Sequence, residues 1–101
     1  MIYHRQKIQN IDQIADWMFQ AGYYQYAIAL AEEAVRKPDC SEIIPNILVK
    51  SAMNAGQIST ISSIRYIANK DIAFKIVEKL DENGFTELAW TVYINNCFHC
   101  V

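Results

Sequence analysis

Glycine and proline are scarce in this chain, which contains three glycines and two prolines in 101 residues. No stretch is rich in either residue or of low complexity, so we expect no linker and a single domain spanning residues 1–101. Long apolar runs are also missing, because none approaches the ~18 residues of a membrane span. Residues 1–10 are polar and lack the apolar centre of a secretory signal. We therefore expect no membrane insertion and a cytoplasmic location.

Basic charge is not in excess either. The net charge is −2 and the isoelectric point is near 5.6, whereas nucleic-acid-binding domains usually carry a basic face. The three cysteines are an odd number, which fits a reducing compartment better than a disulfide framework. These features predict no nucleic-acid partner.

Catalytic motifs are absent from the sequence. There is no phosphate-binding glycine loop, and no serine or cysteine has the local signature of an activated nucleophile. The Cys97-Phe98-His99-Cys100 run suggests a metal site, but zinc needs four ligands, and Cys40 or His4 would have to complete the set. We expect ordinary thiols, no metal, no cofactor and no enzymatic activity. A zinc- or thiol-dependent regulator is the alternative, which metal analysis would decide.

The sequence does contain helical periodicity, divided by its glycines. Gly22, Gly56 and Gly84 each close one segment of helical spacing and precede another. Gly22 and Gly56 lie 34 residues apart, which is the period of the tetratricopeptide repeat, and Gly56 and Gly84 lie 28 apart. A small residue follows five positions after two of them, at Ala27 and Ala89. The pattern predicts an all-α fold in which antiparallel helix hairpins stack as a tetratricopeptide-like superhelical array, with about six helices in three repeats.

Helix boundaries follow from caps and breakers. Asn10 is the expected cap of the first helix, and Pro38 ends the second, whose last turn carries Arg36 and Lys37. Four further helices are expected. The third helix is capped by Ser41 and has Pro45 in its first turn, and the fourth spans Gln57–Asn69. The fifth runs from about Lys70 or Asp71 to Asn83, and the sixth begins near Phe85 with Thr86 as its cap. Isoleucine recurs every three residues in the Gln57–Asn69 segment, although its serines and threonine are poor helix formers.

Three runs of sequence resemble a known family. They are Ile14-Ala15, Ala27-Ile28-Ala29-Leu30-Ala31-Glu32 and Ser51-Ala52-Met53-Asn54-Ala55-Gly56-Gln57. Together they look like the larger, tetratricopeptide-like member of the chaperone pair that binds the needle subunit of bacterial type III secretion systems. The resemblance implies a chaperone that holds the needle subunit in the bacterial cytosol, with a small helical co-chaperone. A generic tetratricopeptide adaptor or a small inhibitor protein is the alternative.

In such an array the first helix of each unit lines the concave side, where a partner helix binds. This places candidate groove residues on the first, second and third units; they are Phe19, Asn46, Lys50, Met53, Phe74, Val77 and Glu78. The alternative for each of them is an ordinary core position. Trp90 and Ile94 join the candidate groove because residues 88–101 contain no Asp, Glu, Lys or Arg, and a helix that is apolar all round should be covered. The alternative is that this tail folds back into the chain's own groove.

The first helix offers a second candidate surface. Trp17 lies off its apolar stripe, and an exposed tryptophan is a common interface anchor. The resemblance implies that the co-chaperone docks at this end, where the candidate residues are Ile8, Ile11, Trp17 and Met18.

Overall fold

The computed structural model describes residues 10–98, apart from the side chains of residues 97 and 98. Within that range the chain is all-α, as predicted, and has no strand. Its elements are α2 (Ile11–Gln20), α3 (Tyr24–Ala34), α4 (Ile44–Asn54), the 3₁₀ helix η1 (Ile58–Ser63), α5 (Lys70–Glu82), α6 (Thr86–Tyr93) and the π-helical segment η2 (Ile94–Phe98).

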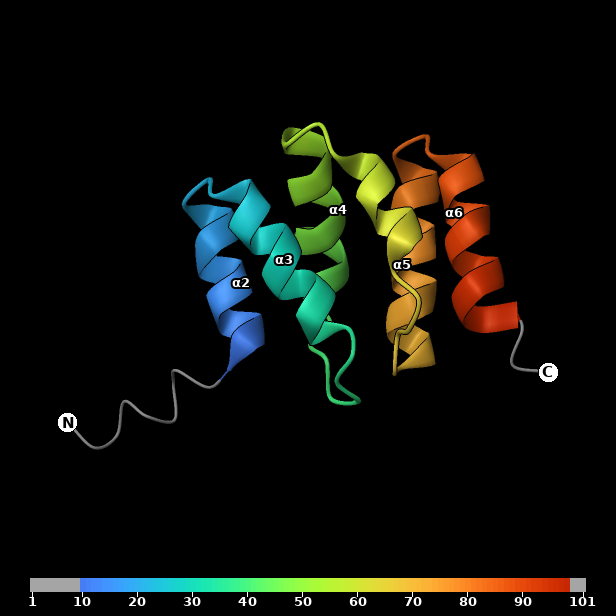
Figure 1. Cartoon of the computed structure of the whole chain (residues 1–101), viewed down its shortest axis with the longest axis horizontal. Helices are drawn as coiled ribbons and strands as arrows, with labels where there is room; N and C mark the ends of the chain where they lie inside the picture. The colour runs from blue at the N-terminus through green and yellow to red at the C-terminus, as the bar shows by residue number, and fades with distance from the viewer. Residues whose placement is uncertain (1–9, 99–101) are drawn as a thin grey trace.

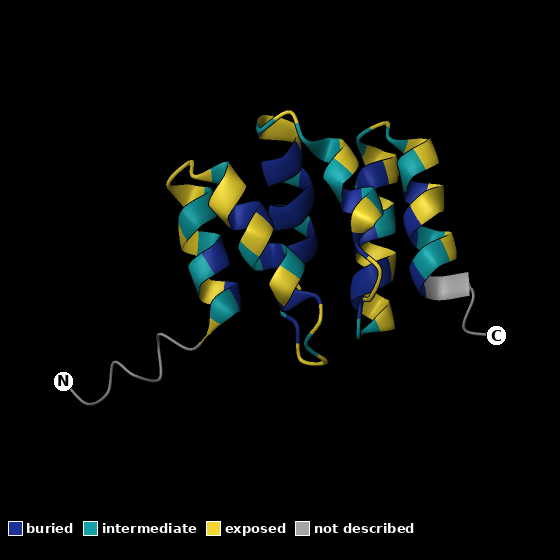
Figure 2. Ribbon diagram, in the orientation of Figure 1, coloured by how far each residue is buried: buried dark blue, intermediate teal, exposed yellow. Residues whose placement is uncertain are grey.

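The helices form three hairpins that stand side by side (Figure 1). The pairs are α2 with α3, α4 with η1, and α5 with α6. The first helix of the second pair, α4, packs against both α2 and α3, while α5 packs on α4 and α6 packs on η1. Figure 2 shows that α4, in the middle of the array, is the most continuously buried helix. The two end hairpins therefore have one covered face and one open face each.

All three glycines end a helix in the same way. Their φ angles are +85°, +68° and +90°, in the left-handed region that a side chain disfavours. The residue after each glycine donates its N–H to a carbonyl five residues back; these bonds are Tyr23 to Met18, Gln57 to Ala52 and Phe85 to Leu80, at 2.8–2.9 Å. This is the Schellman geometry, and it confirms the glycine-terminated hairpins predicted from the sequence.

A buried carboxylate fixes the start of the array. Asn10 caps α2 as predicted, because its Oδ1 accepts the N–H groups of Asp12 and Gln13. Asp12 is itself 5% exposed; its Oδ1 lies 2.7 Å from Lys37 Nζ, and its Oδ2 accepts the N–H of Ser41 at 2.6 Å. One side chain of α2 thus holds the loop that joins α3 to α4.

The same contacts explain two wrong boundary predictions. Arg36 and Lys37 follow α3 instead of lying in its last turn, because α3 ends at Ala34 and the chain then turns to bring Lys37 to Asp12. Ser41 does not cap α4, which begins at Ile44; its hydroxyl accepts the N–H of Ile43.

The helical part of the segment Gln57–Asn69 is also shorter than predicted. Only its first part is helical, as η1, and Ile64 is already extended. Thr60, Ser62 and Ser63 each donate a side-chain hydroxyl to a carbonyl three residues back, which favours 3₁₀ geometry over an α-helix. The chain then passes along α3, where the N–H of Ala68 donates to Val35 O at 3.0 Å. Its isoleucines still enter the core at positions 61, 64 and 67.

The last helix changes its geometry before it ends. Thr86 is the first residue of α6 and not its cap; its hydroxyl donates to Asp81. After Tyr93 the chain continues as η2, within which the buried Asn96 donates its side-chain N–H to the carbonyl of Val92. That carbonyl is the acceptor that an α-helical bond from residue 96 would use, so the side chain competes with the α-helix.

Candidate functional site

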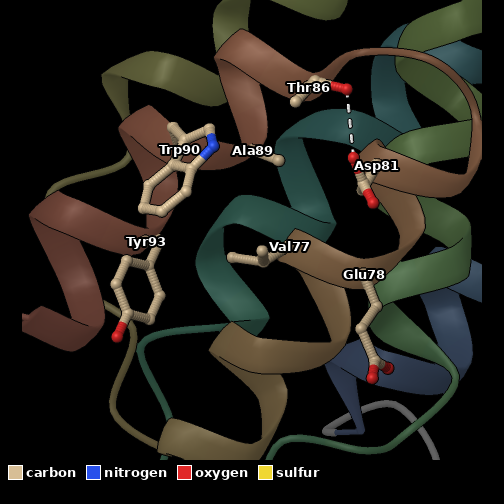
Figure 3. Close-up of a pocket in the computed structure, with 7 residues that line it drawn as sticks. All are labelled: Val77, Glu78, Asp81, Thr86, Ala89, Trp90 and Tyr93. Carbon is tan, nitrogen blue, oxygen red and sulfur yellow. Dashed lines mark hydrogen bonds between the residues drawn. The ribbon is translucent and has the colours of Figure 1, made fainter.

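An apolar hollow of about 320 Å³ lies between α5 and α6 (Figure 3). Gly84, with a φ of +90°, reverses the chain between the two helices, and the small, buried Ala89 forms part of the wall of the hollow. Its lining residues are Val77, Glu78 and Asp81 from α5, and Thr86, Ala89, Trp90 and Tyr93 from α6. The hydroxyl of Thr86 donates to Asp81 Oδ1 at 3.0 Å and links the two helices at the hairpin end of the hollow.

Aromatic rings flank the hollow on its α6 side. The centroids of Trp90 and Tyr93 lie 5.8 Å apart, edge to face, and Phe74 of α5 lies 6.2 Å from Tyr93. Trp90 is 60% exposed and Phe74 is 45% exposed. Clustered apolar rings at an open surface are typical of a contact site for another molecule. We call this surface of α5 and α6, with the hollow and its three rings, the end face.

The charge at the end face is acidic. Glu78 and Asp81 are exposed carboxylates at the rim, and the described residues that line the hollow include no lysine or arginine. Lys75 and Lys79 of α5 line a different, polar hollow between α4 and α5. Lys79 is also engaged by Glu82 at 3.6 Å. The end face therefore presents an apolar floor with a negative margin.

Some of the candidate groove residues line these two hollows, and the others line neither. Val77, Glu78 and Trp90 come together in the end face, with Phe74 beside them. Asn46 and Glu78 line the polar hollow between α4 and α5. Ile94 is 51% exposed on η2 and lines neither hollow, which is also true of Phe19, Lys50 and Met53.

Four lining residues were not among the sequence candidates: Asp81, Thr86, Ala89 and Tyr93. Ala89 was identified as a small-residue position of the repeat, and Tyr93 lies in the charge-free tail, so both carried a signal. The sequence does not show that Ala89 and Tyr93 face α5, because this depends on how the two helices pack.

Three of the co-chaperone candidates, Ile11, Trp17 and Met18, lie on α2 at the other end of the array (Figure 1). Trp17 is 54% exposed, whereas Ile11 and Met18 are half-buried and pack against the core. Ile8 lies outside the described residues. Two tyrosines extend the exposed aromatic surface near Trp17 in the chain, since Tyr23 and Tyr26 stack edge to face at 6.3 Å.

The part of the chain with described side chains includes one free thiol, that of the buried Cys40. No group of three or more potential metal ligands occurs there, and His99 and Cys100 lie outside it. Burial, with a smaller contribution from the negative charge of Asp12, raises the pKa of Cys40 to about 11. A neutral, buried thiol is a poor nucleophile and a poor metal ligand.

Comparison of the chain with protein-family models, with curated proteins and with solved structures gives no match. Over residues 10–98, no helix combines the length and the apolar character that crossing a bilayer requires. The functional assignment therefore depends on the site itself.

Proposed function

We propose that this protein is a non-catalytic cytoplasmic chaperone that holds another protein chain, the needle subunit of a bacterial type III secretion system, together with a small helical co-chaperone. One observation carries the proposal. The exposed ring of Trp90 and the half-buried ring of Tyr93 line an apolar hollow on a helix pair, and the exposed ring of Phe74 lies beside Tyr93. The partner identities follow from the family resemblance in the sequence.

The geometry suits a helix-in-groove contact. A subunit that polymerises through an amphipathic helix stays soluble when the apolar side of that helix is covered. The hollow accepts side chains from such a helix, and the rings add large, rigid contact area with little conformational entropy to lose. Covering the helix removes the polymer interface from solution.

The position of Trp17 suits a second partner. It lies on α2, and the end face lies on α5 and α6, at opposite ends of the array (Figure 1). Two partners bound at these two places do not compete for the same surface. A ternary complex is therefore sterically allowed.

Co-expression with the needle subunit and the co-chaperone of the same genome tests the proposal. Size-exclusion chromatography with light scattering should give one complex with one copy of each chain. The Trp90→Ser variant should lose the needle subunit and keep the co-chaperone, and Trp17→Ser should do the reverse. A soluble monomer that associates with neither partner would rule the proposal out.

A further inference from the structure

The end face is the counterpart of a surface that is buried in the first hairpin. Trp90 stands six residues after Gly84, and Ile28 stands six residues after Gly22. Ile28 is 5% exposed, whereas Trp90 is 60% exposed. The same position of the repeat is thus core in one hairpin and open surface in the other.

Two more positions behave alike. Ala15 and Val77 each precede the glycine of their hairpin by seven residues; Ala15 is fully buried, and Val77 is half-buried in the hollow. Ala31 and Tyr93 each follow the glycine by nine, and Ala31 is also fully buried while Tyr93 is not. In the first hairpin the covering element is α4, which packs against both α2 and α3.

From this equivalence we infer that α5 and α6 take a further helix, supplied by another protein, in the place that α4 holds on α2 and α3. The inference deepens the proposed function and rests on it for the identity of the partner. The guest helix extends the array by one helix, so it lies along the hairpin and needs a length close to that of α4, which has 11 residues. It inserts apolar side chains into the hollow and presents small residues opposite the rings, because Trp90 and Tyr93 stand where the first hairpin has isoleucine and alanine.

The guest helix is basic beside its apolar stripe. Glu78 and Asp81 line the hollow, its described lining residues include no cation, and Glu78 makes no ion pair with any described residue. A second copy of this chain is a poor occupant in a two-fold contact, because such a contact brings the same patch onto itself and sets these carboxylates against one another. Lysine or arginine residues flanking the guest's apolar stripe satisfy both carboxylates.

Tryptophan fluorescence measures the contact directly. The chain has two tryptophans, so a Trp17→Phe variant leaves Trp90 as the sole reporter. The probe is a 16-residue synthetic amphipathic helix with a leucine–alanine stripe flanked by lysines. The control peptide is identical except that glutamates replace the lysines. We expect a saturable blue shift of Trp90 emission with the lysine peptide and affinity weaker by about tenfold or more with the glutamate peptide.

Charge-removal variants locate the effect. Glu78→Gln with Asp81→Asn should abolish the preference for the lysine peptide. Glu87 is an exposed carboxylate of α6 that does not line the hollow, so the Glu87→Gln variant should keep the preference for the lysine peptide. The inference is overturned if neither peptide shifts the emission, if both bind equally well, or if Trp90 emission shifts with protein concentration alone, which would identify a second copy as the occupant.

The outcomes separate this inference from the proposed function. If the protein binds the lysine peptide at Trp90 but does not bind the needle subunit, the docking surface is supported and the proposed chaperone function is wrong. If the Trp90→Ser variant binds the needle subunit as well as the unsubstituted protein does, the chaperone function is supported and the docking surface is wrong.

Discussion

Trp90 and Ile28 occupy the same position of two helix hairpins, yet Ile28 is 5% exposed and Trp90 is 60% exposed. α4 packs against both helices of the first hairpin, whereas the ring of Trp90 in the third hairpin stays exposed among the described elements. The larger apolar side chain, whose exposure to water is the more unfavourable, therefore lies at the exposed position. A side chain placed in this way contributes to binding more than to folding.

The stability of variants at the two positions should reflect this contrast. Ile28→Ala should lower the free energy of unfolding by about 2–4 kcal/mol, because it leaves a cavity in a packed interface. Trp90→Ser should lower it by less than about 1 kcal/mol, since an exposed ring loses little on truncation. Urea unfolding followed by circular dichroism measures both. Equal losses at the two sites would mean that Trp90 is a folding residue.

The ion pair between Asp12 and Lys37 should stabilise the first hairpin. Asp12→Asn removes the charge that meets Lys37 Nζ at 2.7 Å and weakens the bond from the N–H of Ser41, so we expect a loss of about 2–3 kcal/mol in unfolding free energy. Asp39→Asn is the matched control. Asp39 lies 4.0 Å from the same lysine but is largely exposed, and its loss should change almost nothing. A similar loss in both variants would show that general charge balance, not the buried pair, matters.

Alkaline pH should destabilise the fold through two groups. Folding raises the pKa of Cys40 from 9.0 to about 11. The contribution of this thiol to the free energy of unfolding is therefore complete below pH 9 and is lost between pH 9 and about 11. The hydrogen bond to Asp12 raises the pKa of Lys37 above its usual 10.5, so the stability of that pair is complete below pH 10.5 and lost at still higher pH. Urea titrations from pH 7 to 11 should show a decline that begins near pH 9. In the Cys40→Ala variant the first part of the decline should be absent, and a decline that persists unchanged would contradict the assignment.

The thiol of Cys40 should also be slow to react. In a Cys97→Ser, Cys100→Ser background, Cys40 is the remaining cysteine, and its neutral, buried thiol should resist an aromatic disulfide reagent at pH 8 until the chain unfolds. The rate should rise steeply in denaturing urea. Rapid labelling of the folded protein would show that the thiol is accessible.

Backbone conformation should dominate the effect of substitution at the hairpin glycines. A Cβ at Gly56 meets no atom within 4 Å, so Gly56→Ala suffers no clash, but its φ of +68° disfavours a side chain. We expect a loss of about 1–2 kcal/mol. Gly56→Asn should lose less, because asparagine tolerates the left-handed region better. If alanine and asparagine were equally destabilising in urea unfolding, the φ angle would not be the cause.

Local signals predicted most of the fold. The glycine turns, the Asn10 cap and the extent of α5 depend on residues close in sequence, and all appear where expected. The wrong boundaries depend on distant partners or on side-chain competition. Lys37 lies beyond the end of α3 and pairs with a carboxylate on α2, which helix propensity does not indicate. The low helix propensity of the serines and threonine after Gln57 was a warning, but it does not predict that their hydroxyls bond to carbonyls three residues back in a 3₁₀ segment.

The candidate site was predictable in part for the same reason. Trp90 was identified because the tail lacks charge, and Val77 and Glu78 because the repeat places them on a first helix. Their meeting in one hollow depends on how α5 and α6 pack, which periodicity does not give. The exposure of Trp90 depends on how the described elements pack around α5 and α6, which is a property of the packing as a whole.

Hydroxyl-radical footprinting of the two tryptophans tests the central claim most directly. Both are more than half exposed in the free chain, so both should be oxidised readily. In a binary complex with the needle subunit, we predict strong protection of Trp90 and unchanged oxidation of Trp17. Oxidation of Trp90 at the rate of the free chain, in a complex shown to be intact, would contradict the account.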